Sequence, residues 1–276
     1  METLYNVSAK NITTYGGNGI VKEILLPETF EEVQELWANH DNISILGGGS
    51  NTIILDGVIN DKVVSFKKLD SIEIDGNIVR VGAGARLHRV VHKARECALG
   101  GLEFMMGVPA SIGGLVKMNA SAFGHEIGVY VDKIIALNHD FEICEYFAPF
   151  DFGYRRGFQG VVLQVDLRLD TMEREQSVAK ENQYRAIRRL HQPVGRSAGS
   201  VFKNPSKSAG YYIDKVGLKG TRIGGAQIST LHGNFIINTN DGSADDYLQL
   251  VALAKGRVHE EFGILLQEEF VLIGEI

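Results

Sequence analysis

The sequence predicts a mixed helix and strand protein of the α+β class, with α/β stretches, built from more than one compact unit. The spacing of the apolar residues alternates along the chain between the two-residue period of strands and the wider period of helices. The 276 residues exceed one average domain, so two or three units are expected. Hydrophobic residues make up 44% and charged residues 22%, which is typical of a globular protein with a sizeable core.

The elements follow one another in a regular order along the first two thirds of the chain. A small α/β unit comes first, and a hairpin then turns at Asp75-Gly76-Asn77. A helix over residues 87–98 is expected to end at Gly100-Gly101. The expected strands cover residues 20–26, 43–46, 53–55, 72–74, 78–81, 133–136, 142–146 and 161–169, and a further helix covers 31–38.

A long charged helix over residues 173–190 precedes Pro193, and the main domain boundary is placed there. Beyond it we expect a helix over 209–216 and a strand over 235–238. An amphipathic helix over 244–262 opens on Ser243, with Asp246 three residues later, as in a capping box. Gly263 is suited to end that helix.

Composition and charge exclude several classes of protein. The net charge is -6 and the Lys and Arg residues are scattered, which argues against a nucleic-acid partner. Cys97 and Cys144 have no C-x-x-C spacing, which suits a reducing cytoplasm and excludes a cysteine metal site. No signal-like start and no apolar run of about 20 residues are present, so we expect a cytoplasmic protein with no membrane partner.

Two glycine-rich blocks predict the binding of an anionic cofactor. The first comprises Gly47, Gly48, Gly49, Ser50 and Asn51. The second includes Gly107, Pro109, Ser111, Ile112, Gly113 and Gly114, with Asn119 shortly after it. Each block follows an apolar run, so each is expected to cross the end of a sheet as a loop. Glycine lets the backbone approach a phosphate closely and aim its N–H groups at it. A tight turn is the alternative reading of the first block.

Neither glycine block matches a standard nucleotide motif. The G-x-x-x-x-G-K-[ST] loop is missing, as is the strand, G-x-G-x-x-G and distal acid of a Rossmann unit. A dinucleotide held by two separate loops is therefore the better interpretation.

Two later segments carry groups suited to catalysis. Arg155 follows the aromatic Tyr154, and a guanidinium so placed can hold a carboxylate or a developing enolate. Ser200, Lys203 and Asn204 lie between Gly199 and Pro205, and a serine there could protonate only a strongly basic carbon. A surface arginine and a capping serine are the structural alternatives.

Near the C-terminus, Glu268 and Glu269 lie in an apolar segment over residues 264–273 that is expected to be extended. A half-buried carboxyl there is costly without a function. Both faces of the expected strand are apolar, so the pattern does not choose between the two. His88 and His92 have helical i, i+4 spacing but no acidic neighbour suited to a metal, and they are interpreted as ordinary helix residues.

Taken together, these segments resemble the UDP-N-acetylenolpyruvoylglucosamine reductase family of flavoenzymes, over nearly the whole chain. The resemblance is carried by the two glycine blocks with Met118-Asn119-Ala120, Tyr154-Arg155, Gly199 to Pro205, Ala209-Gly210, Gly217 to Gly220, Gly225 to Ser229, His232 and Asn238.

The resemblance implies a two-subdomain FAD-binding region of the vanillyl-alcohol-oxidase (PCMH) type and a C-terminal α+β domain for a UDP-sugar. The implied boundaries are 1–66 and 67–192 for the FAD subdomains and 193–276 for the substrate domain. FAD would be bound non-covalently by the two glycine blocks, and NADPH would be the hydride donor. The chain would be a monomer with small-molecule partners, acting in peptidoglycan precursor synthesis.

By the same resemblance, Arg155 steadies an enolate and Ser200 protonates C2 of UDP-N-acetylglucosamine enolpyruvate. The catalytic glutamate maps to Glu269 when Gly274 is the anchor, with Glu268 as the fallback. The implied substrate-site residues are Tyr154, Lys203, Asn204, Lys219, Gln227 and His232. A flavin-dependent alcohol or sugar oxidase, and a non-catalytic UDP-sugar-binding module, are the rival interpretations.

Two departures from the family pattern stand out. Arg156-Gly157-Phe158 follows Arg155, where many members carry a serine or threonine shortly after the tyrosine-arginine pair. The stretch between Arg155 and Ser200 is short, which is typical of the subclass that lacks a tyrosine-bearing insertion.

Overall fold

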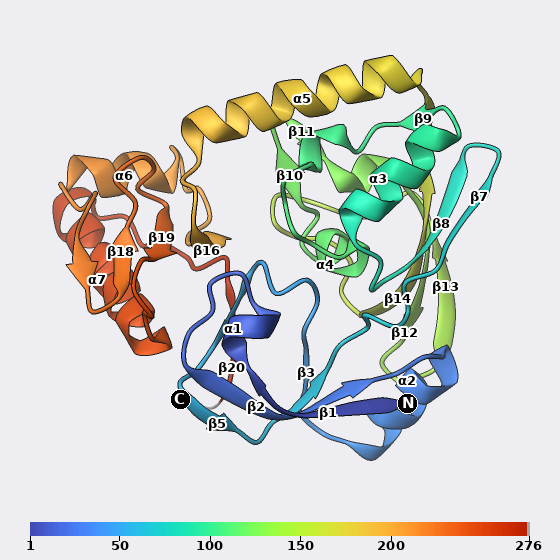
Figure 1. The fold of residues 1–276 in the computed structure, drawn as a ribbon, viewed down its shortest axis with the longest axis horizontal. Helices are drawn as coiled ribbons and strands as arrows, with labels where there is room; N and C mark the ends of the chain where they lie inside the picture. Colours follow the sequence, from blue (N-terminus) through green and yellow to red (C-terminus); the bar gives the residue numbers. More distant parts are fainter. Residues whose placement is uncertain (275–276) are drawn as a thin grey trace. The chain divides into compact units, whose positions relative to one another are not determined.

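The computed structural model describes residues 1–274, and its contacts divide them into two compact units (Figure 1). Unit 1 contains Met1–Thr3, Leu25–Gly48 and Lys62–Arg188. Unit 2 contains Leu4–Ile24, Gly49–Asp61 and the residues from Arg189 onward. Strand β1 (Glu2–Ser8), strand β2 (Gly19–Leu26) and helix α5 (Arg174–His191) each contribute residues to both units. The division into 1–66, 67–192 and 193–276 stays a prediction.

Unit 1 is built on a five-stranded antiparallel sheet. Its order is β13 (Ile143–Phe147), β12 (Val131–Leu137), β14 (Val161–Arg168), β8 (Ile78–Gly82) and β7 (Ile72–Asp75). In β14, Leu163, Val165 and Leu167 are fully buried. Alternate residues of a strand point to the same face, so these three side chains face the core together. Val165 pairs with Val81, and Leu167 pairs with Val79. These rows fix the register of the sheet.

Short elements and helices complete unit 1. Helix α3 (Leu87–Glu96) buries Leu87, Val90, Val91 and Ala94, the apolar stripe of an amphipathic helix. In Figure 1, helix α5 passes over one end of the small hairpin of β10 (Ser121–Ala122) and β11 (His125–Glu126), where its Tyr184 stacks on Phe123 of the turn. The other elements are α2 (Phe30–Asn39), β3 (Ile43–Ile45), β6 (Lys62–Val64), β9 (Leu99–Gly100), η1 (Glu103–Met105), α4 (Ile112–Lys117), η2 (Ile127–Tyr130) and β15 (Asp170–Thr171).

Unit 2 has a four-stranded antiparallel sheet with a long helix packed on it. The order is β16 (Arg196–Ser200), β19 (Phe235–Asn238), β18 (Ala226–Ile228) and β17 (Arg222–Ile223). Helix α7 (Ala244–Phe262) packs against β17 and β18 and buries Tyr247, Leu250, Val251, Ala254 and Val258. Strand β20 (Val271–Ile273) pairs in parallel with β4 (Thr52–Ile54). The remaining elements are α1 (Ala9–Ile12), β5 (Gly57–Ile59) and α6 (Ala209–Lys215).

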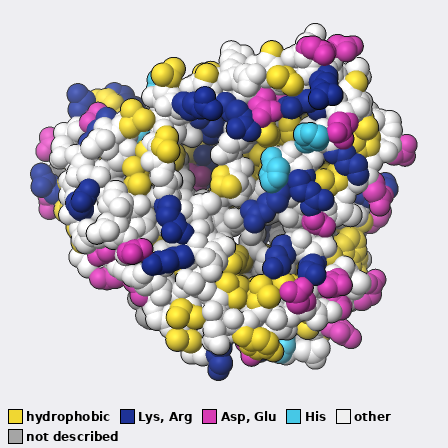
Figure 2. Space-filling model, in the orientation of Figure 1, with side chains coloured by type: hydrophobic (Ala, Val, Ile, Leu, Met, Phe, Trp, Pro, Cys, Tyr) yellow, Lys and Arg dark blue, Asp and Glu magenta, His cyan; other side chains and the backbone are white. Residues whose placement is uncertain are grey.

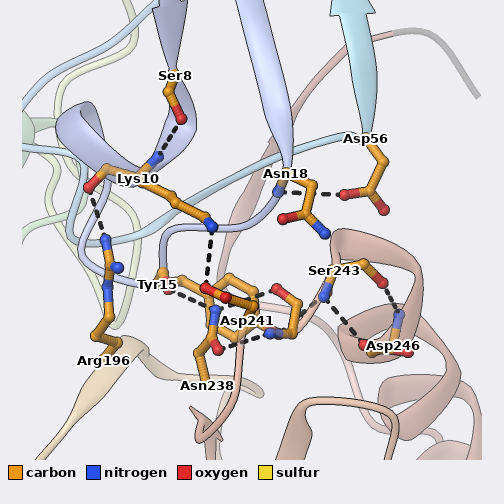
Figure 3. Close-up of polar contacts among 11 residues, drawn as sticks. Ser8, Lys10, Tyr15, Asn18, Asp56, Arg196, Asn238, Asp241, Ser243 and Asp246 are labelled. Atoms are coloured by element: carbon orange, nitrogen blue, oxygen red, sulfur yellow. Dashed lines mark hydrogen bonds and ion pairs between the residues drawn. The ribbon is translucent and has the colours of Figure 1, made fainter.

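A network of polar contacts joins the early residues of unit 2 to its late ones (Figure 3). The Asn238 side chain donates to the Tyr15 and Gly242 carbonyls, both at 3.1 Å. Lys10 forms an ion pair with Asp241 at 2.9 Å. The Asp56 carboxylate accepts from the N–H groups of Ala244 and Asp245, at 3.1 and 3.0 Å, and so caps helix α7 from a distant segment.

Most expected strands and helices are confirmed, but three local expectations were wrong. The helix expected over 87–98 ends at Glu96, and the left-handed residue after it is Ala98, at φ +53°, whereas Gly100 belongs to β9. The second glycine block is a loop only over residues 107–111, because helix α4 begins at Ile112 and includes Gly113 and Gly114. In the segment over 264–273, only Val271–Ile273 forms a strand.

Among residues 1–274, no helix is both long and apolar enough to cross a membrane.

Candidate active site

The structure brings part of the first glycine block against the second block within unit 1. A Cβ atom added to Gly48 would lie 2.6 Å from the Pro109 carbonyl oxygen, and one added to Gly47 would lie 3.0 Å from the Ser111 hydroxyl. Distances this short leave no room for a side chain at Gly48. The glycines are therefore needed where the two backbones meet.

Arg86, which the sequence did not single out, ties the two blocks together. Its Nη1 donates to the Gly48 carbonyl at 3.3 Å and lies 3.5 Å from that of Pro109. Arg86 and Ser111 also form an isolated antiparallel bridge, and the Ile112 N–H donates to the Ala85 carbonyl at 3.0 Å. Only the folded chain reveals this role, because Arg86 lies far from both blocks in the sequence.

The rest of the first block lies in unit 2. Gly49 has φ +69°, and a Cβ there would lie 2.0 Å from the Ile12 carbonyl oxygen. The Asn51 side chain donates to the Glu269 carbonyl at 2.9 Å, and the Asn51 carbonyl accepts from the Val271 N–H at 2.9 Å. Asn51 therefore places the backbone of Glu269.

Ser200 lies beside the same C-terminal segment. It ends β16, opposite Phe235, after a bulge at Gly199, whose φ is +77°. The Glu269 N–H donates to the Val201 carbonyl at 2.9 Å, and the Lys203 N–H donates to the Gln267 carbonyl at 2.8 Å. Bulges redirect side chains in many active sites. Unit 2 thus gathers Asn51, Ser200 and Glu269.

The two glutamates have different surroundings. The Glu268 carboxylate accepts a hydrogen bond of 2.5 Å from Lys255, a residue of helix α7. Burial acts to raise the pKa of Glu268, but the hydrogen bond and charge of Lys255 outweigh it and hold that pKa below its usual value. Glu269 is half-buried. Burial raises the pKa of the Tyr247 hydroxyl, and the negative charge of Glu269 raises it further.

In unit 2, Lys219 and Gln227 lie in the neighbourhood of His232. The Gln227 side chain donates to the Gly220 carbonyl at 3.0 Å, and Lys219 lies 3.3 Å from Asp214. Burial, followed by the positive charge of Lys219, lowers the pKa of His232. His232 Nδ1 accepts from the Asn234 N–H at 3.2 Å. Lys219, Gln227 and His232 therefore share one neighbourhood.

Asn234 braces the Ser200 segment and was missed by the sequence reasoning. Its side chain accepts from the Phe202 N–H at 2.9 Å and donates to the Phe202 carbonyl at 2.8 Å. Asn204 is exposed, and its side-chain oxygen accepts from the Ala209 N–H at 3.0 Å. Lys203 is half-buried beside them.

In unit 1, Arg155 lies in a tight turn. Gly153 and Arg156 exchange backbone hydrogen bonds of 2.8 and 3.0 Å, and Arg155 between them has φ +55°. Its guanidinium carbon lies 5.0 Å from the ring centroid of Tyr154, which is itself exposed. A non-glycine residue in this region of backbone space is uncommon and points to a function.

Asn119 is fully buried, and its side chain contacts protein groups. Its oxygen accepts from the Gly128 N–H at 3.0 Å. Its Nδ2 donates to Glu126 at 2.9 Å and to the Gly153 carbonyl at 3.1 Å. The side chain therefore supports the Arg155 turn, and the backbone N–H of Asn119 donates to the Val116 carbonyl at 3.2 Å.

His88 and His92 both lie on helix α3, but the expectation that no acidic residue lies near them was wrong, because Glu96 is a neighbour of His92. Both line a surface groove over α3, and Figure 2 shows basic side chains gathered with acidic ones on that face. His92 lies 3.5 Å from Glu96, and Arg89 pairs with Asp70. Among residues 1–274, no cluster of three or more His, Cys, Asp or Glu side chains could hold a metal.

Comparisons with known proteins give the family. Residues 190–273 match the model described as UDP-N-acetylenolpyruvoylglucosamine reductase, C-terminal domain, and residues 21–138 match the FAD binding domain. The UDP-N-acetylenolpyruvoylglucosamine reductase of Caldicellulosiruptor bescii is 37% identical over 100% of this chain and 92% of that protein. Reductase 2 of Bacillus cereus is 35% identical over 96% of this chain and 91% of its own length.

A solved structure agrees with these relatives. The UDP-N-acetylenolpyruvylglucosamine reductase (MurB) of Thermus caldophilus superposes with a TM-score of 0.83 at 35% identity, covering 98% of each chain. In unit 1, Gly48 packs so closely on the Pro109 carbonyl that no side chain fits between them. This packing brings together two glycine blocks whose backbone N–H groups are of the kind that binds a diphosphate. The chain therefore belongs to the UDP-N-acetylenolpyruvoylglucosamine reductase family and is an FAD-dependent oxidoreductase.

Proposed function

We propose that this chain reduces UDP-N-acetylglucosamine enolpyruvate to UDP-N-acetylmuramate with NADPH as the hydride donor, a step of peptidoglycan precursor synthesis. The observation that carries the proposal is the backbone pairing in unit 2. It sets the Ser200 segment beside the Glu269 segment, with Asn51 of the first glycine block bonded to the latter. A cofactor loop, a hydroxyl and a carboxyl are thereby assembled on one framework.

FAD, when bound, supplies the hydride exchange between NADPH and the vinyl ether of the substrate. The two glycine blocks would hold it, with Arg86 and Ser111 fixing the approach of one block to the other. The proposed contacts come from Gly47, Gly48, Gly49, Ser50, Asn51, Gly107, Pro109, Ser111, Ile112, Gly113, Gly114 and the backbone of Asn119.

Three side chains act on the substrate in this proposal. Arg155 steadies the negative charge that develops when hydride reaches C3 of the enolpyruvyl group. The Ser200 hydroxyl then gives its proton to C2, which a weak acid can do only because that carbon is strongly basic. Glu269 completes the set as the carboxyl that the family resemblance assigns, with Glu268 as the fallback.

The UDP-sugar would be held mainly by unit 2. Lys219 is suited to the diphosphate, because a lysine offers a compact positive charge and three donors. Gln227, His232, Lys203 and Asn204 would contact the rest of the ligand. Tyr154, exposed in the turn of unit 1, is assigned to the same ligand.

The wider assignments complete the proposal. Residues 1–66 and 67–192 would act as the two FAD subdomains, and 193–276 as the substrate domain. The protein would act in the cytoplasm as a monomer, with no membrane or nucleic-acid partner. Its scattered basic residues and net charge of -6 support the last point.

Anaerobic reduction and reoxidation test the function. The purified protein should carry FAD, lose its yellow colour when NADPH is added, and regain it when UDP-N-acetylglucosamine enolpyruvate follows. An oxidase would instead be reoxidised rapidly by oxygen and not by the enolpyruvate. A binding module would bind the UDP-sugar without any change in colour, and either outcome would refute the proposal.

A further inference from the structure

A hydroxyl from a distant hairpin holds the guanidinium of Arg155. Arg155 Nη1 donates to Ser121 Oγ at 2.7 Å, although 34 residues separate them. Both residues are half-buried, and both belong to unit 1. A hydrogen bond from a charged donor is stronger than a neutral one and more restrictive in direction.

The residues that follow Arg155 offer no hydroxyl for this purpose. Arg156 turns away to a two-point contact with Asp151, at 2.7 and 3.1 Å. A Cβ at Gly157 would lie 1.9 Å from the Val116 carbonyl oxygen, so position 157 cannot accept a serine. Phe158 packs edge-on against Tyr146, with ring centroids 4.9 Å apart. The contact to Arg155 must therefore come from elsewhere in the fold.

Buried Asn119 fixes the distance between Ser121 and Arg155. It bonds to Glu126, at the end of the hairpin that carries Ser121, and to the Gly153 carbonyl in the turn that carries Arg155. The hairpin and the turn are thus tied to the same fully buried side chain. The Ser121 hydroxyl can then act as a fixed acceptor for a long and otherwise adaptable side chain.

We propose that Ser121 is a positioning residue, which orients the Arg155 guanidinium toward the developing enolate. The proposal rests on the role given to Arg155 under the proposed function. It predicts that the Ser121 hydroxyl matters for the rate at saturating substrate more than for the binding of FAD or of the UDP-sugar.

The test compares two variants of nearly the same shape, Ser121→Thr and Ser121→Val. Threonine keeps a hydroxyl group where valine has a methyl group. Ser121→Thr should keep kcat within about threefold of the wild type, and Ser121→Val should lower kcat about tenfold or more relative to Ser121→Thr. The KM for the UDP-sugar and the FAD content should match between the two variants. Ser71→Ala, at an exposed position of unit 1, serves as the control and should leave kcat unchanged.

Arg155→Lys separates failure of this proposal from failure of the proposed function. If Arg155→Lys lowers kcat while Ser121→Val and Ser121→Thr turn over equally, the positioning role is wrong and the role of Arg155 stands. If Arg155→Lys leaves kcat unchanged, the role of Arg155 itself is wrong. Where the positioning role holds, Ser121→Val should change kcat less than about twofold in the Arg155→Lys background, since the two effects are not independent.

Discussion

Arg155 combines an unfavourable backbone conformation with a side chain that the proposed chemistry needs. Its φ of +55° is one that glycine adopts without cost, yet the turn carries an arginine stacked near Tyr154 and bonded to Ser121. Strain of this kind is retained where the surrounding structure holds it and where function requires it. In this turn, stability and activity are therefore expected to respond differently to the same substitution.

Arg155→Gly should relieve the backbone strain while removing the guanidinium. We expect the free energy of unfolding to change by less than about 1 kcal/mol, because lost contacts offset the relieved strain. The rate of product formation should fall by about a hundredfold or more. Thermal unfolding and steady-state kinetics on the same preparation check this, and a parallel loss of stability and activity would contradict it.

Ser200→Ala should separate the two halves of the reaction. NADPH should still bleach the flavin, because the serine has no assigned part in that step. Formation of UDP-N-acetylmuramate should slow by about a hundredfold or more, since the proton donor to C2 is lost. Stopped-flow absorbance with each substrate in turn measures both steps, and an unchanged rate of reoxidation would remove Ser200 from the mechanism.

At the scale of single elements, helix α7 depends on groups from two parts of the chain. Ser243 and Asp246 form the capping box that the sequence predicted, with bonds of 2.9 and 3.0 Å. Asp56 adds acceptors for two more N–H groups of the first turn. A helix that packs on the sheet of unit 2 is thus fixed at its start by a residue next to β5.

Asp56→Ala should destabilise the protein by about 1 kcal/mol, the usual cost of losing a helix cap. Asp56→Asn keeps one acceptor oxygen and should lose less than Asp56→Ala. Urea denaturation followed by circular dichroism measures both variants. Equal stability of the wild type and Asp56→Ala would show that the Ser243 box alone fixes the helix start.

The elements that could be predicted from the sequence are those with local signals. Helix α7 begins and ends at the residues that its caps predict, Ser243 and Gly263. Helix α3 ended early because Ala98 takes the left-handed conformation that local propensity reserves for glycine. Helix α4 was missed because Gly113 and Gly114 oppose helix formation. The close packing of Gly113 against Ala83, which explains that glycine, exists only in the folded chain.

The site was predictable as a set of segments and not as a set of contacts. Glycine blocks and the Ser200 segment could be found because their residue types are unusual for ordinary loops. The choice of Glu269 over Glu268 rests on the family resemblance. The contact of Glu268 with Lys255, 13 residues away, is one that no pattern in a short window contains. Ser121 carries no local signal either, since its contact to Arg155 exists only in the folded chain.

At the scale of the whole molecule, a half-buried ion pair links two helices of unit 1. Glu181 of α5 bonds to Arg95 of α3 and to Arg185, and the Arg95 side chain also donates to Ser177 at 2.9 Å. Burial acts to raise the pKa of Glu181, but the hydrogen bonds from the two arginines outweigh it and leave that pKa below its ordinary value of 4.5. A lowered carboxyl pKa stabilises the folded state above pH 4.5, and this contribution is lost as the pH falls through the folded-state pKa.

Glu181→Gln should therefore destabilise the protein at pH 7 by about 1 to 2 kcal/mol, since the amide cannot provide the charge. The difference from the wild type should shrink below pH 4.5 and vanish once Glu181 is protonated. Denaturant unfolding at a series of pH values measures it. A difference that stayed constant down to acid pH would mean that shape, and not charge, carries the effect.

The central claim is that this chain adds a hydride to C3 and a solvent-derived proton to C2 of the enolpyruvyl group. Turnover with unlabelled NADPH in deuterated water, followed by nuclear magnetic resonance of the product, tests it directly. We predict UDP-N-acetylmuramate with one deuterium at C2, whether or not exchange of the flavin N5–H with solvent also labels C3. Protium at C2 of the product, or the absence of a reduced product from a protein that carries FAD, would contradict the account.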